Sequence, residues 1–116
     1  MSNQLQVLIR ARALLAKGWT QKVYARDSNN RIVPISSPEA CKWCLDGAIK
    51  AAAEEKGGSA YDVIHMLDRQ LGQSSIDWND NPRRTQASVL RRLDRIITEM
   101  TNADQRSNTA GGNGIL

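Results

Sequence analysis

Apolar residues recur at helical spacing over four stretches of the chain, and they alternate with polar residues in one segment between the first two. The helical stretches cover residues 3–17, 37–56, 59–71 and, after a lead-in at residues 81–85, a run that ends near Thr101. The pattern therefore predicts a mainly α fold. We expect a compact bundle of four main helices with a small two-stranded hairpin between the first and second helices.

The second stretch, residues 37–56, is apolar around more than half of its helical circumference, so other helices are expected to cover it on several sides. Ser37, Pro38 and Glu39 supply the signals of a helix start, which are a hydroxyl cap, a proline in the first turn and a glutamate placed for a capping box. Within the helix, Gly47 costs about 1 kcal/mol relative to Ala, which indicates a packing constraint at that position.

The alternating segment predicts the hairpin. Residues 22–26 and 31–35 read as two short strands, and residues 27–30, with the sequence Asp-Ser-Asn-Asn, read as the turn that joins them. Residues 73–80 are expected to be a loop. A lone hairpin is marginal in water, so this one must lie against the helices.

The last helix has the clearest amphipathic pattern, and a polar tail follows it. One arc of about 120° holds its apolar residues: Val89, Leu90, Leu93, Ile96, Ile97 and Met100. Residues 103–116 are rich in Gly and Asn, and such a tail is expected to be disordered unless it contacts a neighbouring subunit. Residues 1–102 are therefore expected to form a single helical domain.

Basic residues gather in two regions of a chain whose formal net charge is only +4. The first 35 residues hold six Lys or Arg against one Asp, and residues 81–102 are also rich in Arg. An anionic partner is expected if the fold brings the two regions together, and ordinary solvated surface is the alternative. The chain has no apolar run of the roughly 20 residues that a membrane span needs, so we expect a cytoplasmic protein with no membrane contact.

Few residues are suited to catalysis or metal binding. Cys41 and Cys44 form a CxxC pair, but the single histidine, His65, leaves a zinc site short of ligands, and buried apolar thiols are the favoured interpretation. One histidine and no suitably framed carboxylate pair disfavour an enzyme. We predict no metal and no cofactor.

The strongest candidate site lies at the entry to the last helix. Arg83 and Arg84 stand at a helix N-terminus, where anions are favoured and cations are not, which is the arrangement of a phosphate site. Trp78 could stack on a base. Pairing of the arginines with Asp77 and Asp80 is the structural alternative.

Arg12 is a second candidate, because it falls inside the apolar arc of the first helix. A buried guanidinium needs a carboxylate, carbonyl groups or a bound anion. An internal salt bridge is favoured over the bound anion, since buried charges are commonly paired.

Four ordered blocks carry a resemblance to a known family. They are Gly18-Trp19-Thr20-Gln21, Tyr24-Ala25-Arg26-Asp27, Trp43-Cys44-Leu45-Asp46-Gly47-Ala48, and Trp78-Asn79-Asp80 followed by Arg84-Thr85. Over residues 5–100 the chain resembles a family of short uncharacterised bacterial and bacteriophage proteins, filed as a domain of unknown function. Arg83 departs from that family's pattern, which has glycine after the proline. The resemblance implies a small prokaryotic or phage protein and no particular activity.

If the polar residues of these blocks converge, they form the natural site with the arginines. The predicted ligand-binding residues are Arg84, Arg83, Trp78, Asn79, Asp80, Thr85, Arg26, Trp19, Thr20, Gln21, Tyr24 and Arg12.

We therefore expect a non-catalytic protein that binds a small anionic, nucleotide-like ligand, such as a phage protein that sequesters a host defence signal. A protein-binding inhibitor or regulator, such as a phage protein that blocks a host defence complex, is the alternative. A ligand site would be a concave pocket lined by Arg and Trp, and an inhibitor would present a flat exposed patch. A DNA-binding regulator is the third candidate. Its recognition helix would be the stretch at residues 59–71, where Asp62 and Asp68 make a poor surface for DNA phosphates. A homo-oligomer is also among the expected assemblies.

Overall fold

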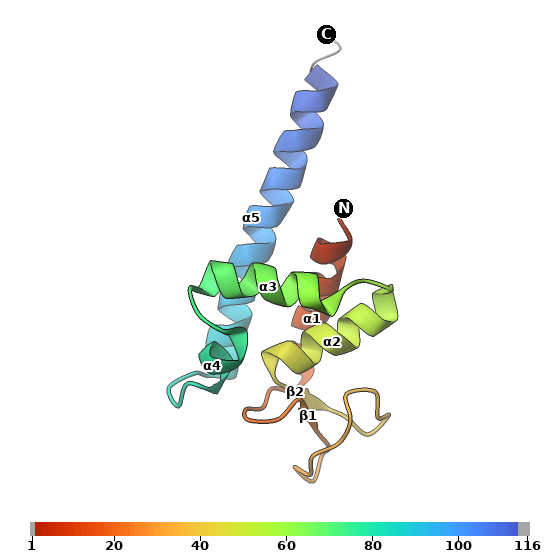
Figure 1. Ribbon diagram of the computed structural model, residues 1–116, viewed down its shortest axis with the longest axis vertical. Helices are drawn as coiled ribbons and strands as arrows, with labels where there is room; N and C mark the ends of the chain where they lie inside the picture. The colour runs from red at the N-terminus through yellow and green to blue at the C-terminus, as the bar shows by residue number, and fades with distance from the viewer. Residues whose placement is uncertain (1, 114–116) are drawn as a thin grey trace.

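The computed structural model describes residues 2–113, with side chains through residue 106, and it is mainly helical. Five helices and one two-stranded antiparallel sheet follow one another along the described chain: α1 (Asn3–Lys17), β1 (Ala25–Arg26), β2 (Lys42–Trp43), α2 (Leu45–Lys56), α3 (Ala60–Leu71), α4 (Ser75–Asp80) and α5 (Gln86–Asn113). Figure 1 shows the helices gathered above the small sheet, with α5 extending well past the other elements. The predicted fold class, a helical bundle with a hairpin between the first two helices, is confirmed at this level.

The core forms where α1 meets its neighbours. Leu8, Ala11 and Leu15 of α1 are fully buried, and α1 packs against α2, α3, β2 and α5. Helix α2 is covered by α1, α3 and α4, as its wide apolar arc predicts. Helix α5 reaches the core mainly through its contact with α1. Its far end extends along the long axis of the molecule.

The second helix begins later than the sequence pattern predicts. Residues 37–44 are not helical, and α2 starts at Leu45 with the Cys44 thiol as its cap, since Sγ accepts from the Gly47 amide at 3.3 Å. Ser37 instead accepts the Glu39 amide within a turn. Trp43 is extended because its backbone is bonded on both sides to the chain that leaves α1: its amide donates to the Gly18 carbonyl and its carbonyl accepts the Thr20 amide.

The hairpin has the predicted turn but a different second strand. The Asn30 amide donates to the Asp27 carbonyl, and the Asp27 amide donates to the Arg31 carbonyl, which closes the turn at residues 27–30. Ile32 then makes only an isolated bridge to Arg26. The strand that pairs with β1 is β2, in the register Ala25 with Trp43 and Arg26 with Lys42.

Two further differences concern helices. Residues 75–80, expected to be a loop, form the short helix α4, which the Ser74 hydroxyl caps by accepting the Asp77 amide. Helix α5 continues past Thr101, and its next residues include Ala103, Gln105 and Arg106, which favour helix. The predicted tail at residues 103–116 thus overlaps α5 as far as Asn113, and residues 114–116 lie outside the described part. None of the helices described has the length and apolar character that a membrane crossing requires.

Candidate functional site

Five of the twelve residues predicted to bind a ligand are bonded to one another around Asn79: Trp19, Thr20, Gln21, Asn79 and Asp80. The Asn79 side chain is almost fully buried at 1% exposed. Its Oδ1 accepts from Trp19 Nε1 at 2.8 Å and from the Leu45 amide at 3.1 Å, and its Nδ2 donates to the Thr20 carbonyl at 3.2 Å. Asn79 therefore joins the chain after α1, the start of α2 and the end of α4.

Gln21 and Asp80 add hydrogen bonds to the same junction between the chain after α1, the start of α2 and the end of α4. Gln21 Nε2 donates to the carbonyl oxygens of Asn79 and Asn81, each at 2.9 Å. Asp80 Oδ1 accepts from the Lys22 amide at 2.9 Å and from Asn79 Nδ2 at 3.0 Å. Lys22 has a positive φ of 76°, so the Asp80 carboxylate holds an unusual backbone conformation in place.

Arg26 is bonded within the segment between α1 and α2. Its Nε donates to Thr20 Oγ1 at 2.9 Å and its Nη1 donates to the Asn30 carbonyl at 3.1 Å. A longer contact of 3.5 Å joins Nη2 to the Gln21 carbonyl. The Arg26 guanidinium thus supports the hairpin turn. None of its three hydrogen bonds involves Arg84 or another residue at the entry to α5.

Arg12 forms the internal salt bridge that its position on the wheel favours. Its Nε and Nη2 donate to the two carboxylate oxygens of Asp94, at 2.8 and 3.0 Å. The bridge links α1 to α5, and its hydrogen bonds raise the pKa of the Arg12 guanidinium. The Asp94 carboxylate is thereby committed to α1.

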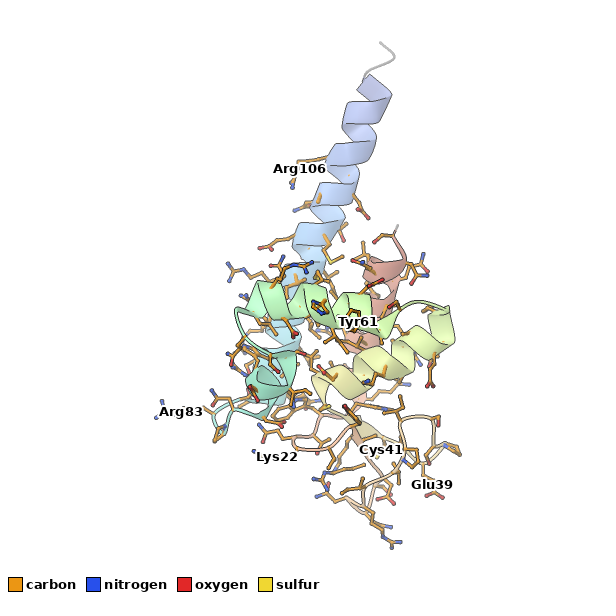
Figure 2. The ribbon with its side chains drawn as sticks, in the orientation of Figure 1. Lys22, Glu39, Cys41, Tyr61, Arg83 and Arg106 are labelled. Atoms are coloured by element: carbon orange, nitrogen blue, oxygen red, sulfur yellow. The ribbon has the colours of Figure 1, made fainter. Side chains whose placement is uncertain are left out.

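Arg84 and Trp78 do come together at the entry to α5. The Arg84 Cζ lies 3.8 Å from the centroid of the Trp78 ring, and Arg84 Nε donates to the Trp78 carbonyl at 2.9 Å. Arg83 is exposed and extends away from the globule, as Figure 2 shows. Thr85 caps the helix, because its Oγ1 accepts the Ser88 amide at 3.1 Å.

A shallow groove of about 350 Å³ opens beside the stacked pair and follows the first turns of α5. Its lining consists of Trp78, Arg84, Ser88, Arg91, Arg92 and Arg95. We call it the arginine groove. Four of its residues were not singled out as site residues from the sequence, although the spacing 88, 91, 92 and 95 follows one face of a helix.

The charges around the arginine groove are only partly balanced. Arg95 Nε lies 3.6 Å from Glu99 Oε1, and both side chains are well exposed. Arg92 Nη2 donates to the Gln70 carbonyl at 2.8 Å, and Arg92 Nε is a buried donor without a hydrogen-bond partner. Arg84 and Arg91 have no carboxylate partner among the ion pairs of the described residues.

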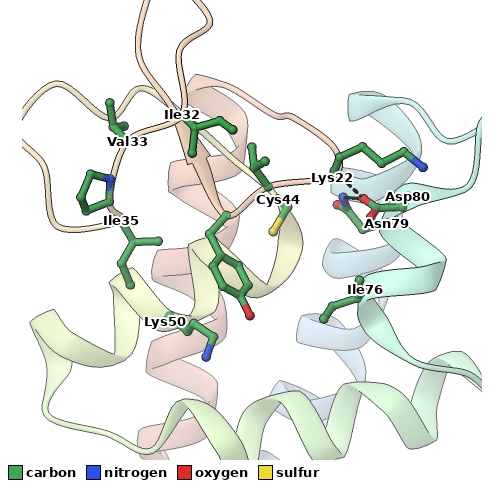
Figure 3. Close-up of a pocket in the computed structure, with 12 residues that line it drawn as sticks. Lys22, Ile32, Val33, Ile35, Cys44, Lys50, Ile76, Asn79 and Asp80 are labelled. Atoms are coloured by element: carbon green, nitrogen blue, oxygen red, sulfur yellow. Dashed lines mark hydrogen bonds between the residues drawn. The ribbon is translucent and has the colours of Figure 1, made fainter.

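Tyr24, the remaining predicted residue, lies elsewhere. It lines a larger hollow of about 580 Å³ between α2, α4 and the loop at residues 32–35, which Figure 3 shows. The structure therefore brings Arg84 and Trp78 together, leaves Arg83 alone, and places Tyr24 in a separate cavity.

The nucleophilic and acidic groups near the start of α2 are buried and serve the fold. Burial raises the pKa of the Cys44 thiol to about 11, so the thiol is neutral near pH 7. Burial also raises the pKa of Asp46, although the hydrogen bond from the Ser75 hydroxyl opposes this shift. Within residues 2–113, no group of three or more His, Cys, Asp or Glu side chains is arranged to hold a metal ion.

Comparison with known proteins gives one match. A family model described as "Family of unknown function (DUF6197)" covers residues 1–99, which include every predicted site residue and the whole arginine groove. Searches of curated proteins and of solved structures found no match.

Proposed function

Since the chain belongs to DUF6197, a family of unknown function, we propose its activity from the groove itself: it binds a small anionic, nucleotide-like ligand without transforming it. The observation that carries this proposal is the convergence of Arg84, Arg91, Arg92 and Arg95 on one hollow. Their guanidinium groups are planar donors that match the paired oxygens of phosphates.

The stacked pair suggests how a base would be held. The face of Trp78 that meets Arg84 is covered, and Trp78 as a whole is only 8% exposed, so direct stacking of a base on the indole is disfavoured. Arg84 is half-buried and lines the groove, and a guanidinium plane stacks well on a nucleobase. The base would therefore lie on Arg84, with the indole fixing the plane beneath it.

The arrangement along α5 suggests where the phosphates would lie. Arg91 and Arg95 are one helical turn apart, about 6 Å along the axis, and this spacing suits neighbouring phosphate groups. The Ser88 hydroxyl already donates to the Thr85 carbonyl at 2.8 Å, so the guanidinium groups are the donors proposed for the phosphates. A volume of about 350 Å³ is at the small end of ligand pockets, which favours one nucleotide over a long polymer.

Calorimetry with a panel of anions tests the proposal. The panel contains mononucleotides, cyclic dinucleotides and inorganic pyrophosphate, with uncharged nucleosides as matched controls and a duplex oligonucleotide for comparison. We expect at least one nucleotide to bind saturably and to weaken as salt is added, and we expect the nucleosides to give no heat. The absence of binding across the panel would contradict the proposal, and tighter binding of the duplex than of every nucleotide would favour a DNA-binding protein instead.

Matched arginine variants assign the binding to the groove. Removing one charge-assisted contact costs about 1.5–3 kcal/mol, so Arg91→Ala and Arg95→Ala should each weaken the best nucleotide by about tenfold or more. Arg106→Ala, an exposed position of α5 beyond the groove, carries the same change of charge and should retain wild-type affinity. Equal losses in all three variants would indicate a diffuse charge effect and would contradict a specific groove.

Sequestration is the simplest role for such a protein. A binder that leaves its ligand unchanged acts by lowering the free concentration of that ligand. We therefore propose that the chain removes a nucleotide-like signal, and a phage countering host defence is the setting that the sequence predicts.

A further inference from the structure

A second cavity has a different chemistry from the arginine groove and shares no residue with it. The hollow of about 580 Å³ lies between the chain after α1, the loop at residues 32–35, the start of α2 and the helix α4 (Figure 3). Its walls are mostly apolar side chains. Those that matter here are Tyr24, Ile32, Val33, Ile35 and Ile76, and we call the cavity the apolar hollow.

Exposed apolar residues are concentrated at the apolar hollow. Five large apolar side chains are well exposed in the described chain, and three of them line this one cavity: Tyr24 at 46%, Ile32 at 68% and Ile76 at 45%. Exposed large apolar groups scattered singly are ordinary, but a cluster around a concave site marks a binding surface. The volume also lies within the usual range of small-molecule pockets, about 300–1,000 Å³.

The polar groups at the rim select the charge of the occupant. Lys50 Nζ lies 5.2 Å from the centroid of the Tyr24 ring, whereas Lys22 also lines the cavity but extends its ammonium group away from that ring (Figure 3). The one carboxylate in the lining, Asp80, already accepts two hydrogen bonds through Oδ1. Asp46 also lies within the electrostatic reach of Lys50 but does not line the cavity. The lining therefore carries one more positive charge than negative.

We propose that the apolar hollow binds an amphiphilic anion, with an apolar body against Tyr24 and Ile76 and a carboxylate or phosphate head at Lys50. The cation already placed over the Tyr24 ring gives the head a fixed position at one end of the cavity. A purely apolar ligand would gain nothing from this ammonium group, and a cationic amphiphile would be repelled by it. This proposal does not depend on ligand binding at the arginine groove, because the two cavities share no lining residue.

Three probes of equal chain length test the chemistry in the full-length protein. Decanoate, decanol and decyltrimethylammonium differ only in the head group. Titration followed by amide chemical shifts should show decanoate saturating one site, with the largest changes at Val23, Tyr24, Cys44 and Ile76. We expect decanol to bind about tenfold more weakly than decanoate, which corresponds to one charge-assisted contact, and the cation to bind more weakly still. Equal binding of all three probes, or shifts spread over the arginine groove, would overturn the proposal.

Matched variants separate the body of the ligand from its head. Ile76→Glu and Ile32→Glu place a carboxylate in the exposed lining, and each should lower decanoate affinity by tenfold or more. Ile9→Glu, on α1 at 39% exposed and outside the hollow, is the control with the same change and should bind as wild type. Lys50→Met keeps the aliphatic stem, so it should retain decanol binding and lose the preference for decanoate. An unchanged preference in Lys50→Met, or wild-type affinity in both glutamate variants, would contradict the site.

Discussion

The guanidinium carbon Cζ of Arg84 lies over the Trp78 ring, 3.8 Å from the indole centroid, while Arg84 Nε donates to the carbonyl oxygen of Trp78. One arginine thus serves two purposes. It ties α4 to the entry of α5, and it lines the arginine groove. A variant at this position should consequently alter both stability and binding.

Arg84→Ala should lower the free energy of unfolding by about 1–2 kcal/mol, because a cation–π contact and a hydrogen bond are both lost. It should also abolish stabilisation by the nucleotide found in the panel. Urea unfolding and calorimetry measure the two effects. Arg84→Lys keeps the charge without the planar donor, so it should recover part of the salt-dependent affinity; binding by Lys equal to that by Arg would contradict stacking on a base.

Asn79→Ala should be among the most destabilising polar substitutions, at about 2–4 kcal/mol, because it leaves the Trp19 indole N–H and the Leu45 amide without their acceptor in a buried place. Chemical denaturation measures the loss, and Trp fluorescence should report it directly. Asn29→Ala, at an exposed position of the hairpin turn, is the matched control and should change stability by less than about 0.5 kcal/mol. Similar losses of stability in Asn79→Ala and Asn29→Ala would contradict the structural role assigned to the Asn79 hydrogen bonds.

Gly47→Ala provides a test of packing against helix propensity. Propensity alone predicts that Ala stabilises α2 by about 1 kcal/mol. A Cβ at this position would instead overlap the carbonyl oxygen of Tyr24, so we expect a loss of about 1–3 kcal/mol, measured by thermal or urea unfolding. Ala51→Gly, one turn later in the same helix, calibrates the propensity effect. A more stable Gly47→Ala protein would refute the close approach.

Arg12→Ala should weaken the fold and leave nucleotide affinity unchanged, because the guanidinium is bonded to Asp94 and lies outside the arginine groove. A double-mutant cycle with Asp94→Ala should give a coupling free energy of about 0.5–1 kcal/mol that shrinks with added salt, since both side chains are partly exposed. Loss of nucleotide binding in Arg12→Ala would return Arg12 to the ligand site.

Stability against pH should reveal the buried carboxylate. Burial raises the pKa of Asp46 above its ordinary value of 3.8, so between the two values the native state binds more protons than the unfolded state. The free energy of unfolding contributed by this group therefore falls as pH rises through that interval. Asp46→Asn should remove this component, which urea unfolding at a series of pH values will show.

Glu55 supplies the comparison of opposite sign. The hydrogen bond from Arg10 lowers the pKa of Glu55, so its contribution to stability is present above the ordinary carboxyl range and is lost as pH falls. Glu55→Gln should flatten the acid side of the profile. If both variants moved the profile in the same direction, the assignment of the buried carboxylate to Asp46 would be wrong.

The helices were predictable where local signals agree with packing. Helix α3, with Ser59 as its N-terminal cap, Val63 and Leu67 buried and Gly72 at its end, matches the helical stretch predicted at residues 59–71. The helix prediction is wrong for residues 40–44, because Ala, Cys and Trp fit a helical period as well as they fit an extended chain. Only the distant Gly18 carbonyl, which takes the Trp43 amide, decides between the two.

The candidate site was predictable only in part, for a related physical reason. A polar residue such as Asn79 or Arg26 looks alike in sequence whether it meets a ligand or a distant backbone group. The residues that bond it, among them Trp19 and Leu45, are remote along the chain. The arginine groove depends on a carboxylate that is bonded elsewhere. Asp94 is paired with Arg12, which leaves Arg91 without a carboxylate partner among the described ion pairs and Arg95 with only the exposed Glu99.

Two glycines anchor the segment between α1 and α2 by backbone contact alone. A side chain at Gly18 would meet the Cys41 carbonyl, and one at Gly47 would meet the Tyr24 carbonyl. Between these two anchoring points, residues 28–30 of the turn and most of the loop at residues 36–39 are exposed, and no glycine holds them to the helices. We therefore expect that a change of chain length at those exposed positions would keep both anchors and would reshape the mouth of the apolar hollow without disturbing the helices beneath it.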